Sequence, residues 1–284
     1  MIILLLSVQF SLGQIYNSDI VIYGGTSSGV IAAIEASRLG NEVILIEPSS
    51  RIGGLTTGGL GQTDIGNKQV IGGIALEFYQ NIKKHYENSN NWIWQEKSEY
   101  KDGGQTRSSV TEDAMWTFEP SAALTVLNEM INDNNIKVFY NERLERKKGV
   151  KKNKNIIKHI IMESGIIFSG KVFIDATYEG DLLASSGISY TVGRESNSVY
   201  GESLNGNQPN ELGKTLKNKI SKNNAHHNFI FGVDPYTVKG NPTSGLLPYI
   251  SEGGPGTEGT GDKGIQAYCF RMTLTDHPEN RLPF

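Results

Sequence analysis

Residues 18–47, SDIVIYGGTSSGVIAAIEASRLGNEVILIE, decide the fold. A β-branched run, a glycine turn, an Ala- and Ile-rich segment and a second apolar run follow one another at residues 19–23, 24–29, 30–39 and 43–46. The two apolar runs are typical of buried strands, and the segment between them is typical of a helix that stops at Gly40. The stretch is therefore predicted to form one βαβ unit.

The glycines of this unit lie where a phosphate can approach the backbone. Gly24 permits a tight turn from strand to helix, and Gly29 lets the helix pack closely on the strand. The N–H groups of the first helical turn, with the positive end of the helix dipole behind them, attract a pyrophosphate. Glu47 follows Gly24 by 23 residues, near the offset of a carboxylate that accepts ribose hydroxyls. The unit is therefore predicted to bind a dinucleotide.

Thr26 departs from the glycine-rich pattern, because the middle position of GxGxxG is usually glycine. Its β-carbon would crowd the approach of a pyrophosphate, although its hydroxyl could donate to a phosphate oxygen. An ordinary βαβ unit with a glycine turn is the alternative interpretation.

A second glycine cluster, RIGGLTTGGLG at residues 51–61, follows the carboxylate at once. Five glycines in nine residues make neither a good helix nor a good strand. Next to a dinucleotide site, such a loop predicts backbone lying against the cofactor, and a nicotinamide-binding unit has no obvious need of it. A flexible surface loop is the alternative.

Four stretches together resemble a known family. Arg51-Ile52-Gly53-Gly54 resembles the arginine-x-glycine-glycine loop of FAD enzymes with a glutathione-reductase-like fold. The wider pattern is similar to secreted bacterial FAD-dependent oxidoreductases that are related to heterodisulfide reductase. The resemblance is carried by residues 24–29, 51–61, 175–181 and 190–203.

The resemblance implies FAD as the cofactor, bound through Gly24, Gly25, Thr26, Ser27, Ser28, Gly29, Glu47, Arg51, Gly53, Gly54 and Leu55. It also implies a backbone contact to adenine near Leu144. Asp175 or Asp181 could bond cofactor hydroxyls, with a helix cap as the alternative role of Asp181. Tyr178 stands where the family often has glycine, which puts close backbone approach in doubt at that point.

Arg194 and Glu195 are guesses at substrate contact, based on the resemblance and on position. No residue stands out as a catalytic acid, base or nucleophile. Trp92 and Trp94 lie in a polar and aromatic insertion, where they could stack on a sugar ring or fill a small core of the insertion itself. Residues 253–264 hold six glycines in twelve positions and are expected to form a mobile loop, a lid or a linker.

The composition of this 284-residue chain excludes several classes of function. Its 27 Lys and Arg against 30 Asp and Glu argue against a nucleic-acid binder that depends on bulk charge. The single cysteine, Cys269, excludes an intrachain disulfide framework and a cysteine-ligated iron–sulfur cluster, although the resembled family is often associated with such clusters. No metal site is expected, since His226 and His227 would point to opposite faces of a strand.

The fold class expected is α/β: a Rossmann-like FAD-binding domain with a parallel sheet and an antiparallel β-meander crossover, plus an incomplete α+β substrate region. Further helices are expected at residues 74–86 and 119–133, and further strands at 136–140, 156–162, 166–169 and 171–174. The expected divisions are a signal peptide (1–13), an FAD-binding domain (18–66 and 119–187), an inserted helical and loop region (67–118) and a truncated substrate domain (188–284).

The apolar residues 1–13 are too few to span a bilayer and resemble the apolar part of a secretory signal peptide. We therefore expect an exported protein, periplasmic or extracellular; a buried first strand, in a cytoplasmic protein, is the alternative. The abrupt C-terminal end indicates an N-terminal fragment of a longer protein.

The function expected is an FAD-dependent oxidoreductase that transfers a hydride or an electron on an unknown small or carbohydrate-derived substrate, with an unidentified electron acceptor. No nucleic-acid partner and no integral membrane segment are expected. A nicotinamide-dependent dehydrogenase and a non-catalytic accessory module of a polysaccharide-processing system remain alternatives.

Overall fold

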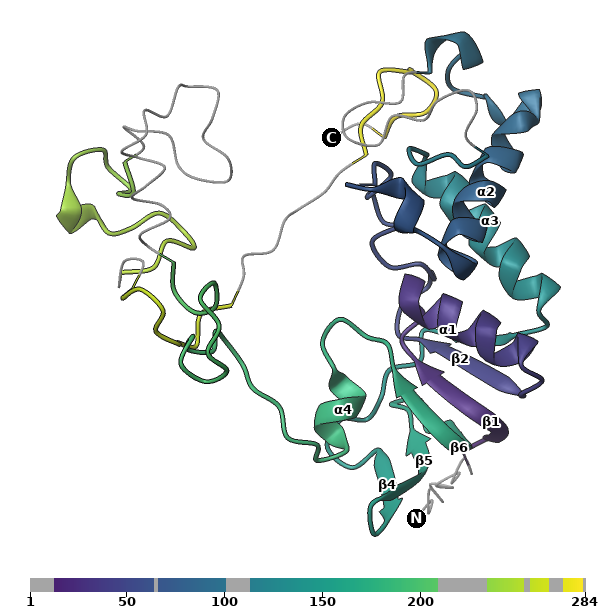
Figure 1. Cartoon of the computed structure of the whole chain (residues 1–284), viewed down its shortest axis with the longest axis horizontal. Helices are drawn as coiled ribbons and strands as arrows, with labels where there is room; N and C mark the ends of the chain where they lie inside the picture. The colour runs from purple at the N-terminus through teal and green to yellow at the C-terminus, as the bar shows by residue number, and fades with distance from the viewer. Residues whose placement is uncertain are drawn as a thin grey trace, which may run out of the picture. The chain divides into compact units, whose positions relative to one another are not determined.

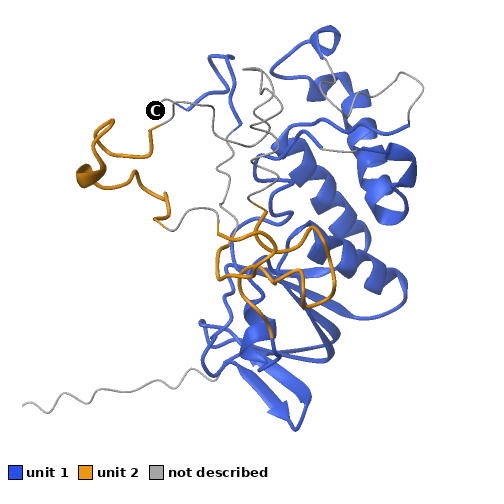
Figure 2. Ribbon diagram, turned by 60° about the vertical axis from the view of Figure 1, so that its left-hand side comes forward, with its two compact units in different colours: residues 1–189, 270–284 blue, residues 190–269 orange. Residues whose placement is uncertain are grey.

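The computed structural model of the chain describes residues 13–63, 66–100, 113–208, 234–252, 256–265 and 273–282. Most of the expected export signal, residues 1–12, and the pair His226 and His227 lie outside these ranges. Two compact units form, coloured separately in Figure 2: unit 1 is Met1–Ser189 with Phe270–Phe284, and unit 2 is Tyr190–Cys269.

Unit 1 is built on a six-stranded sheet in the order β3-β2-β1-β6-β5-β4 (Figure 1). The strands are β1 (Ile15–Tyr23), β2 (Val43–Glu47), β3 (Lys137–Tyr140), β4 (Val150–Asn153), β5 (Ile156–Ile161) and β6 (Ile167–Asp175). β1 pairs in parallel with both β2 and β6, and β2 pairs in parallel with β3. β5 is antiparallel to both of its neighbours, β4 and β6. The expected α/β class, with a parallel sheet and an antiparallel meander, is confirmed.

Both faces of the central strands are buried, as the apolar sequence of β1 and β2 predicts. Side chains alternate between the two faces of a strand, so Ile22 and Leu45 enter one hydrophobic cluster while Val21 and Ile44 enter another. The second cluster also receives Leu182, from the short helix α4 (Asp181–Ser185). The sheet is therefore covered on both faces, which leaves the ends of its strands for the presentation of functional groups.

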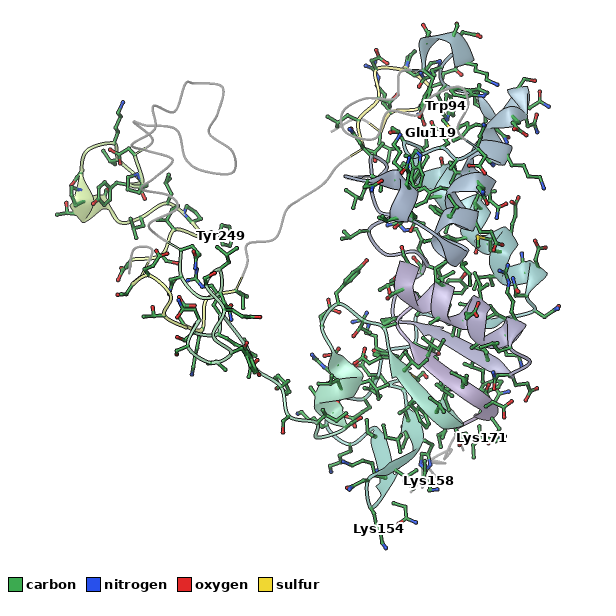
Figure 3. All side chains as sticks on the ribbon, viewed as in Figure 1. Trp94, Glu119, Lys154, Lys158, Lys171 and Tyr249 are labelled. Atoms are coloured by element: carbon green, nitrogen blue, oxygen red, sulfur yellow. The ribbon has the colours of Figure 1, made fainter. Side chains whose placement is uncertain are left out.

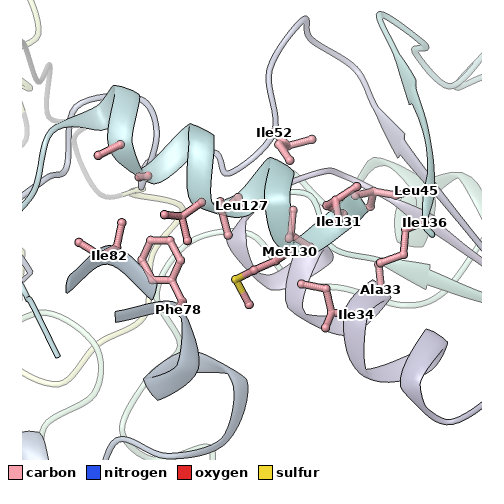
Figure 4. Close-up of a cluster of buried hydrophobic side chains, with 14 of the residues drawn as sticks. Ala33, Ile34, Leu45, Ile52, Phe78, Ile82, Leu127, Met130, Ile131 and Ile136 are labelled. Carbon is pink, nitrogen blue, oxygen red and sulfur yellow. The ribbon is translucent and has the colours of Figure 1, made fainter. Parts of the chain in front are cut away.

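Three helices supply the larger cluster: α1 (Ser27–Arg38), α2 (Gly73–Glu87) and α3 (Pro120–Asp133). Figure 4 shows Phe78 and Ile82 of α2 packed with Leu127 and Met130 of α3. The same cluster contains Ile34 of α1, so α2 shares the core of the sheet. The expected inserted region at residues 67–118 thus contributes to the main core. Short 3-10 helices η1 (Lys68–Val70), η2 (Ser89–Asn91) and η3 (Lys97–Glu99) flank α2.

β6 differs from expectation, because two separate runs were expected where one continuous strand forms. It continues through Gly170 because both halves pair with β1, from Ile15↔Ile167 to Tyr23↔Asp175. A β-carbon at Gly170 would lie 2.8 Å from Val21 Cγ2, so glycine permits this close pairing. β1 likewise begins at Ile15, earlier than the apolar run indicates.

Unit 2 is held by contacts between residues 193–207 and residues 256–264. Arg194 and Asp262 exchange backbone hydrogen bonds of 2.9 and 3.0 Å, and the N–H of Asn207 donates to the carbonyl of Thr260 at 2.9 Å. Residues 256–264 are therefore hydrogen-bonded to the rest of unit 2, and the expectation of a mobile loop, lid or linker stays a prediction; residues 253–255 lie outside the described ranges. Among the described residues of unit 2, the 3-10 helix η5 (Pro242–Ser244) is the only helix or strand.

Candidate functional site: a dinucleotide cavity at the sheet edge

The start of α1 is capped by Thr26. Its hydroxyl accepts from the N–H of Gly29 at 3.3 Å and donates to the carbonyl of Ala176 at 2.7 Å. The side chain therefore turns toward the end of β6, and its one proton is already used. The suggestion that this hydroxyl donates to a phosphate is not supported by the geometry. The N–H groups of Ser27 and Ser28 have no acceptor among the described residues.

Glu47 ends β2 and lies against the same turn. One carboxylate oxygen accepts from the N–H of Gly25 at 2.7 Å, and the other accepts from the N–H of Ser49 at 2.7 Å. The residue is 8% exposed. A β-carbon at Gly25 would lie 2.8 Å from that carboxylate, so only glycine allows the approach. Each oxygen keeps a further lone pair for a ligand hydroxyl.

The second glycine loop is attached to the first. The N–H of Gly53 donates to the carbonyl of Gly25 at 2.7 Å, and the hydroxyl of Ser27 donates to the carbonyl of Gly53 at 2.8 Å. Gly53 and Gly54 have positive φ values of 91° and 52°. These conformations favour glycine and bring the loop backbone alongside the start of α1. The interpretation of a flexible surface loop is wrong for this segment.

Tyr178 covers the second loop from the turn after β6. Its hydroxyl accepts from the N–H of Leu55 at 3.0 Å, and a β-carbon at Gly54 would collide with the same hydroxyl. The residue is 63% exposed. Tyr178, which stands where the resembled family often has glycine, therefore connects the turn after β6 to the second glycine loop.

These groups enclose a cavity of about 260 Å³, here called the cofactor cavity. It is lined by Gly24, Thr26, Glu47, Pro48, Ser49, Arg51, Gly54, Thr177, Tyr178 and Glu179. The structure thus brings together five of the predicted positions from three separate segments. Sequence reasoning did not name Pro48, Ser49, Thr177, Tyr178 or Glu179 as site residues. For Ser49 and Thr177, close adjacency to the predicted carboxylates Glu47 and Asp175 was the available signal.

The residues present fit a dinucleotide. A diphosphate requires backbone N–H donors and positive potential, which the first turn of α1 supplies. A carboxylate typically accepts hydrogen bonds from the ribose hydroxyls of a dinucleotide. Glu47 supplies such a carboxylate, and it is itself hydrogen-bonded to Gly25 in the turn before α1. A β-carbon at Gly24 would lie 2.7 Å from the backbone of Ala176 and Thr177, so the turn has no room for a larger residue at this position.

Asp175 and Asp181 have structural partners. The Asp175 carboxylate accepts from the N–H of Thr177 at 3.0 Å and from the N–H of Leu183, in α4, at 2.8 Å. Asp181 lies 3.8 Å from Arg146 as an ion pair. Asp181 is the first residue of α4, and the N-cap position is occupied by Gly180. The capping role that was the alternative for Asp181 is performed by Asp175, which accepts from the N–H of Leu183. Neither aspartate lines the cofactor cavity.

Leu144 is placed next to the sheet, with its side chain in the smaller core cluster. Its N–H donates to the hydroxyl of Tyr23 at 3.0 Å. Burial raises the pKa of Tyr23, which keeps this phenol protonated. An adenine contact through the Leu144 N–H would require that bond to be given up.

Arg194 and Glu195 belong to unit 2, whereas the residues of the cofactor cavity belong to unit 1. The Arg194 guanidinium pairs with both carboxylate oxygens of Asp262, one of them at 2.9 Å. This pairing raises the pKa of Arg194 and holds the pKa of Asp262 well below its usual range. The charge of Arg194 therefore stabilises unit 2 internally.

Residues 19–284 match the model of a family described as FAD dependent oxidoreductase. No curated protein matches the chain. Among the described residues, no helix has the length and apolar character that crossing a membrane requires.

Solved structures resemble parts of this chain at low identity. L-proline dehydrogenase from P. horikoshii is 18% identical, with a TM-score of 0.39 over 65% of this chain and 59% of that chain. The 3-ketosteroid-delta4-(5alpha)-dehydrogenase from Rhodococcus jostii RHA1 is 16% identical, with a TM-score of 0.36 over 59% and 47%. The flavin-dependent brominase Bmp2 is 17% identical, with a TM-score of 0.40 over 64% and 42%. The chain spans about half the length of these structures.

Proposed function

The chain belongs to the family of FAD dependent oxidoreductases, with FAD as its cofactor, and from this premise we propose that unit 1 holds FAD in extended form for oxidation or reduction of a small molecule. The adenosine ribose would bond to Glu47. The diphosphate would lie at the N–H groups of Ser27 and Ser28. The flavin half would follow the backbone of Gly53 and Gly54.

One observation carries this proposal. The cofactor cavity is lined by Glu47 and by Gly24 and Thr26 of the turn that leads into α1, and the 2.7 Å hydrogen bond from Gly25 to Glu47 fixes the carboxylate against that turn. A ribose acceptor and a diphosphate donor set are thereby held at adjacent points of one rigid turn. A nicotinamide-dependent dehydrogenase is not retained, because the family match indicates FAD and because Gly54 of the second glycine loop is part of the cavity wall.

When bound, FAD supplies the hydride or electron transfer, and the protein supplies binding and orientation. Glu47 orients the ribose through its remaining lone pairs. Arg51, which lines the cavity, contributes the positive charge that a diphosphate requires. Tyr178 holds the Gly54–Leu55 backbone in the conformation that forms the wall. The substrate, small or carbohydrate-derived, and the electron acceptor are not assigned by these residues.

We also propose that the protein is exported, by the apolar segment at residues 1–13 with Ser11 and Gly13 before a cleavage point ahead of Gln14. Mass spectrometry of the protein expressed in a bacterial host, separated into periplasmic and cytoplasmic fractions, tests this. A mature N-terminus at Gln14 in the periplasmic fraction supports export. An intact Met1 terminus confined to the cytoplasm contradicts it.

The visible spectrum of the purified full chain after desalting tests the function. We expect the two flavin absorption bands, with release of free FAD on heat denaturation. A colourless protein that also fails to bind added FAD would contradict the proposal.

A further inference from the structure

An aromatic pocket lies in unit 1 at the side of α2, beyond the cofactor cavity. We define it by Tyr86, Trp92, Trp94, Tyr100 and Glu119, and its volume is about 230 Å³. Nothing in the proposed function uses it. Figure 3 labels Trp94 and Glu119, which both line this pocket.

The aromatic walls are locked in place by hydrogen bonds to backbone. The indole N–H of Trp92 donates to the carbonyl of Tyr86 at 2.8 Å, and the hydroxyl of Tyr100 donates to the carbonyl of Thr117 at 3.0 Å. The Trp92 ring lies 4.9 Å from the Tyr86 ring and 5.6 Å from the Tyr100 ring, centroid to centroid. With their polar atoms occupied, these side chains offer ring faces and edges to a ligand.

Glu119 brings a negative charge to this aromatic wall. One of its oxygens accepts from the hydroxyl of Tyr86 at 2.9 Å, and its backbone N–H donates to the same hydroxyl at 3.2 Å. Burial and the neighbouring carboxylate raise the pKa of Tyr86, so the phenol stays a donor. In the described part of the chain, no Lys, Arg or His forms an ion pair with Glu119, and Glu119 is the only charged residue that lines the pocket.

A carboxylate among aromatic rings, without a protein cation paired to it in the described residues, has the chemistry of a site for an organic cation. Ring faces attract cations through their quadrupole, most strongly where water is excluded, and the carboxylate adds a full opposite charge. An anionic ligand would be repelled by Glu119. A neutral sugar could stack on the rings but would leave the carboxylate without a counter-charge.

The aromatic pocket adjoins a second cavity whose lining includes part of the second glycine loop. This second cavity, of about 890 Å³, is lined by Trp94, Gln95 and Glu119, which also line the aromatic pocket. Its other lining residues include Thr57 and Gly58 of the glycine loop, and Arg51, which also lines the cofactor cavity. Neighbouring cavities thus share lining residues, and all three lie within unit 1.

From this arrangement we propose that the aromatic pocket binds the ammonium group of a small organic amine, the substrate class of this enzyme. The assignment as a substrate rests on the proposed function, since it places the amine beside the flavin. The binding itself rests only on Tyr86, Trp92, Trp94, Tyr100 and Glu119.

The test compares a cation with its neutral isostere on the full-length protein. Choline and 3,3-dimethyl-1-butanol have nearly the same shape and differ in charge. Binding is followed by calorimetry and by tryptophan fluorescence, in which two of the three tryptophans, Trp92 and Trp94, line the pocket. We expect choline to bind at least tenfold more tightly than the alcohol. Equal affinities, or tighter binding of methyl α-glucoside than of choline, would overturn the proposal.

Glu119→Gln is the matching variant, because glutamine can still accept from Tyr86 but carries no charge. We expect it to abolish the preference for choline. Glu87→Gln is the control, since Glu87 is an exposed residue at the end of α2 that does not line the pocket. An unchanged preference in Glu119→Gln, or an equal loss in Glu87→Gln, would overturn the assignment.

Two further outcomes separate this inference from the proposed function. In flavin-containing protein, we expect choline to shift the visible bands. Binding without a shift would overturn the placement beside the flavin. A protein that binds choline through Glu119 but holds no FAD would contradict the proposed function and support the ammonium site.

Discussion

Two glycine-rich regions of this chain are alike in composition and differ in what their backbone touches. In the first, residues 24–29 and 53–61, glycines bring a helix start, a carboxylate and a loop around one cavity. In the second, residues 256–264, a β-carbon at Gly256 would contact the Asn207 amide, and one at Gly259 would collide with the Asn197 amide. The first region contributes Gly24, Thr26 and Gly54 to the wall of a cavity, whereas the second packs against its own unit.

A glycine-rich stretch therefore indicates that the backbone approaches another group closely, and its sequence alone does not identify whether that group is a ligand or the protein itself. Position in the fold decides, because the first region follows the carboxyl ends of parallel strands, where α/β sheets bind ligands. The second lies in a unit without such a sheet among its described residues. Substitutions in the two regions should therefore have separable effects.

The largest effect is expected from Gly24→Ala. Gly24 has a φ of 105°, and the new methyl group would lie 2.7 Å from backbone that cannot move aside. We expect loss of FAD binding, with crowding costing about 1–3 kcal/mol of unfolding free energy in addition to left-handed strain of about 1–2 kcal/mol. Equilibrium FAD titration and urea unfolding measure the two.

Two variants control this result. Gly40→Ala has the same kind of strain, at a φ of 85°, with no atom within 4 Å of the added carbon, so FAD binding should survive. Gly259→Ala, in the second region, should destabilise unit 2 without changing FAD affinity. A loss of FAD binding in Gly259→Ala as large as in Gly24→Ala would break the comparison.

A smaller effect is expected from Glu47→Gln. The amide group of glutamine cannot accept from both Gly25 and Ser49, and the charge-assisted bond to ribose is lost. Such bonds contribute about 1.5–3 kcal/mol, so FAD affinity should fall about 10- to 100-fold. Glu35→Gln, an exposed position on α1, makes the same charge change outside the cavity. Equal affinities of the two variants would exclude Glu47 as the ribose acceptor.

Much of this site was accessible from the sequence, because the βαβ unit is local. Strand, turn, helix and carboxylate follow one another within 30 residues, and each has its own signal. The continuous strand β6 was missed, since Gly170 interrupts the apolar pattern and its pairing with β1 spans about 150 residues. The capping role of Asp175 toward Leu183 likewise depends on a turn whose geometry no spacing rule fixes.

Tyr178→Phe is expected to have a modest effect within the first region. The ring remains, but the hydroxyl that accepts from Leu55 is removed. A neutral hydrogen bond contributes about 0.5–1.5 kcal/mol, so we expect FAD affinity to fall by up to about tenfold. Stopped-flow mixing with FAD measures both rate constants. Tighter binding in the variant would mean that Tyr178 obstructs the cavity.

The smallest effect is expected from Asp262→Asn in the second region. Arg194 lowers the pKa of Asp262 in the folded state, so the pair stabilises unit 2 above the ordinary aspartate pKa of about 4. That contribution is lost as the pH falls from there through the folded pKa. The variant should weaken this acid dependence of unfolding and leave FAD affinity unchanged. An acid dependence identical to that of the unsubstituted protein would show that the pair adds no stability.

We place the nucleotide half of FAD between Glu47 and the start of α1. Titration of the flavin-free full chain with FAD and, in parallel, with FMN, which lacks the adenosine, tests this placement. We expect FAD to bind at least about 100-fold more tightly than FMN, since the ribose and second-phosphate contacts together exceed about 2.7 kcal/mol. Equal affinities for the two flavins would contradict it.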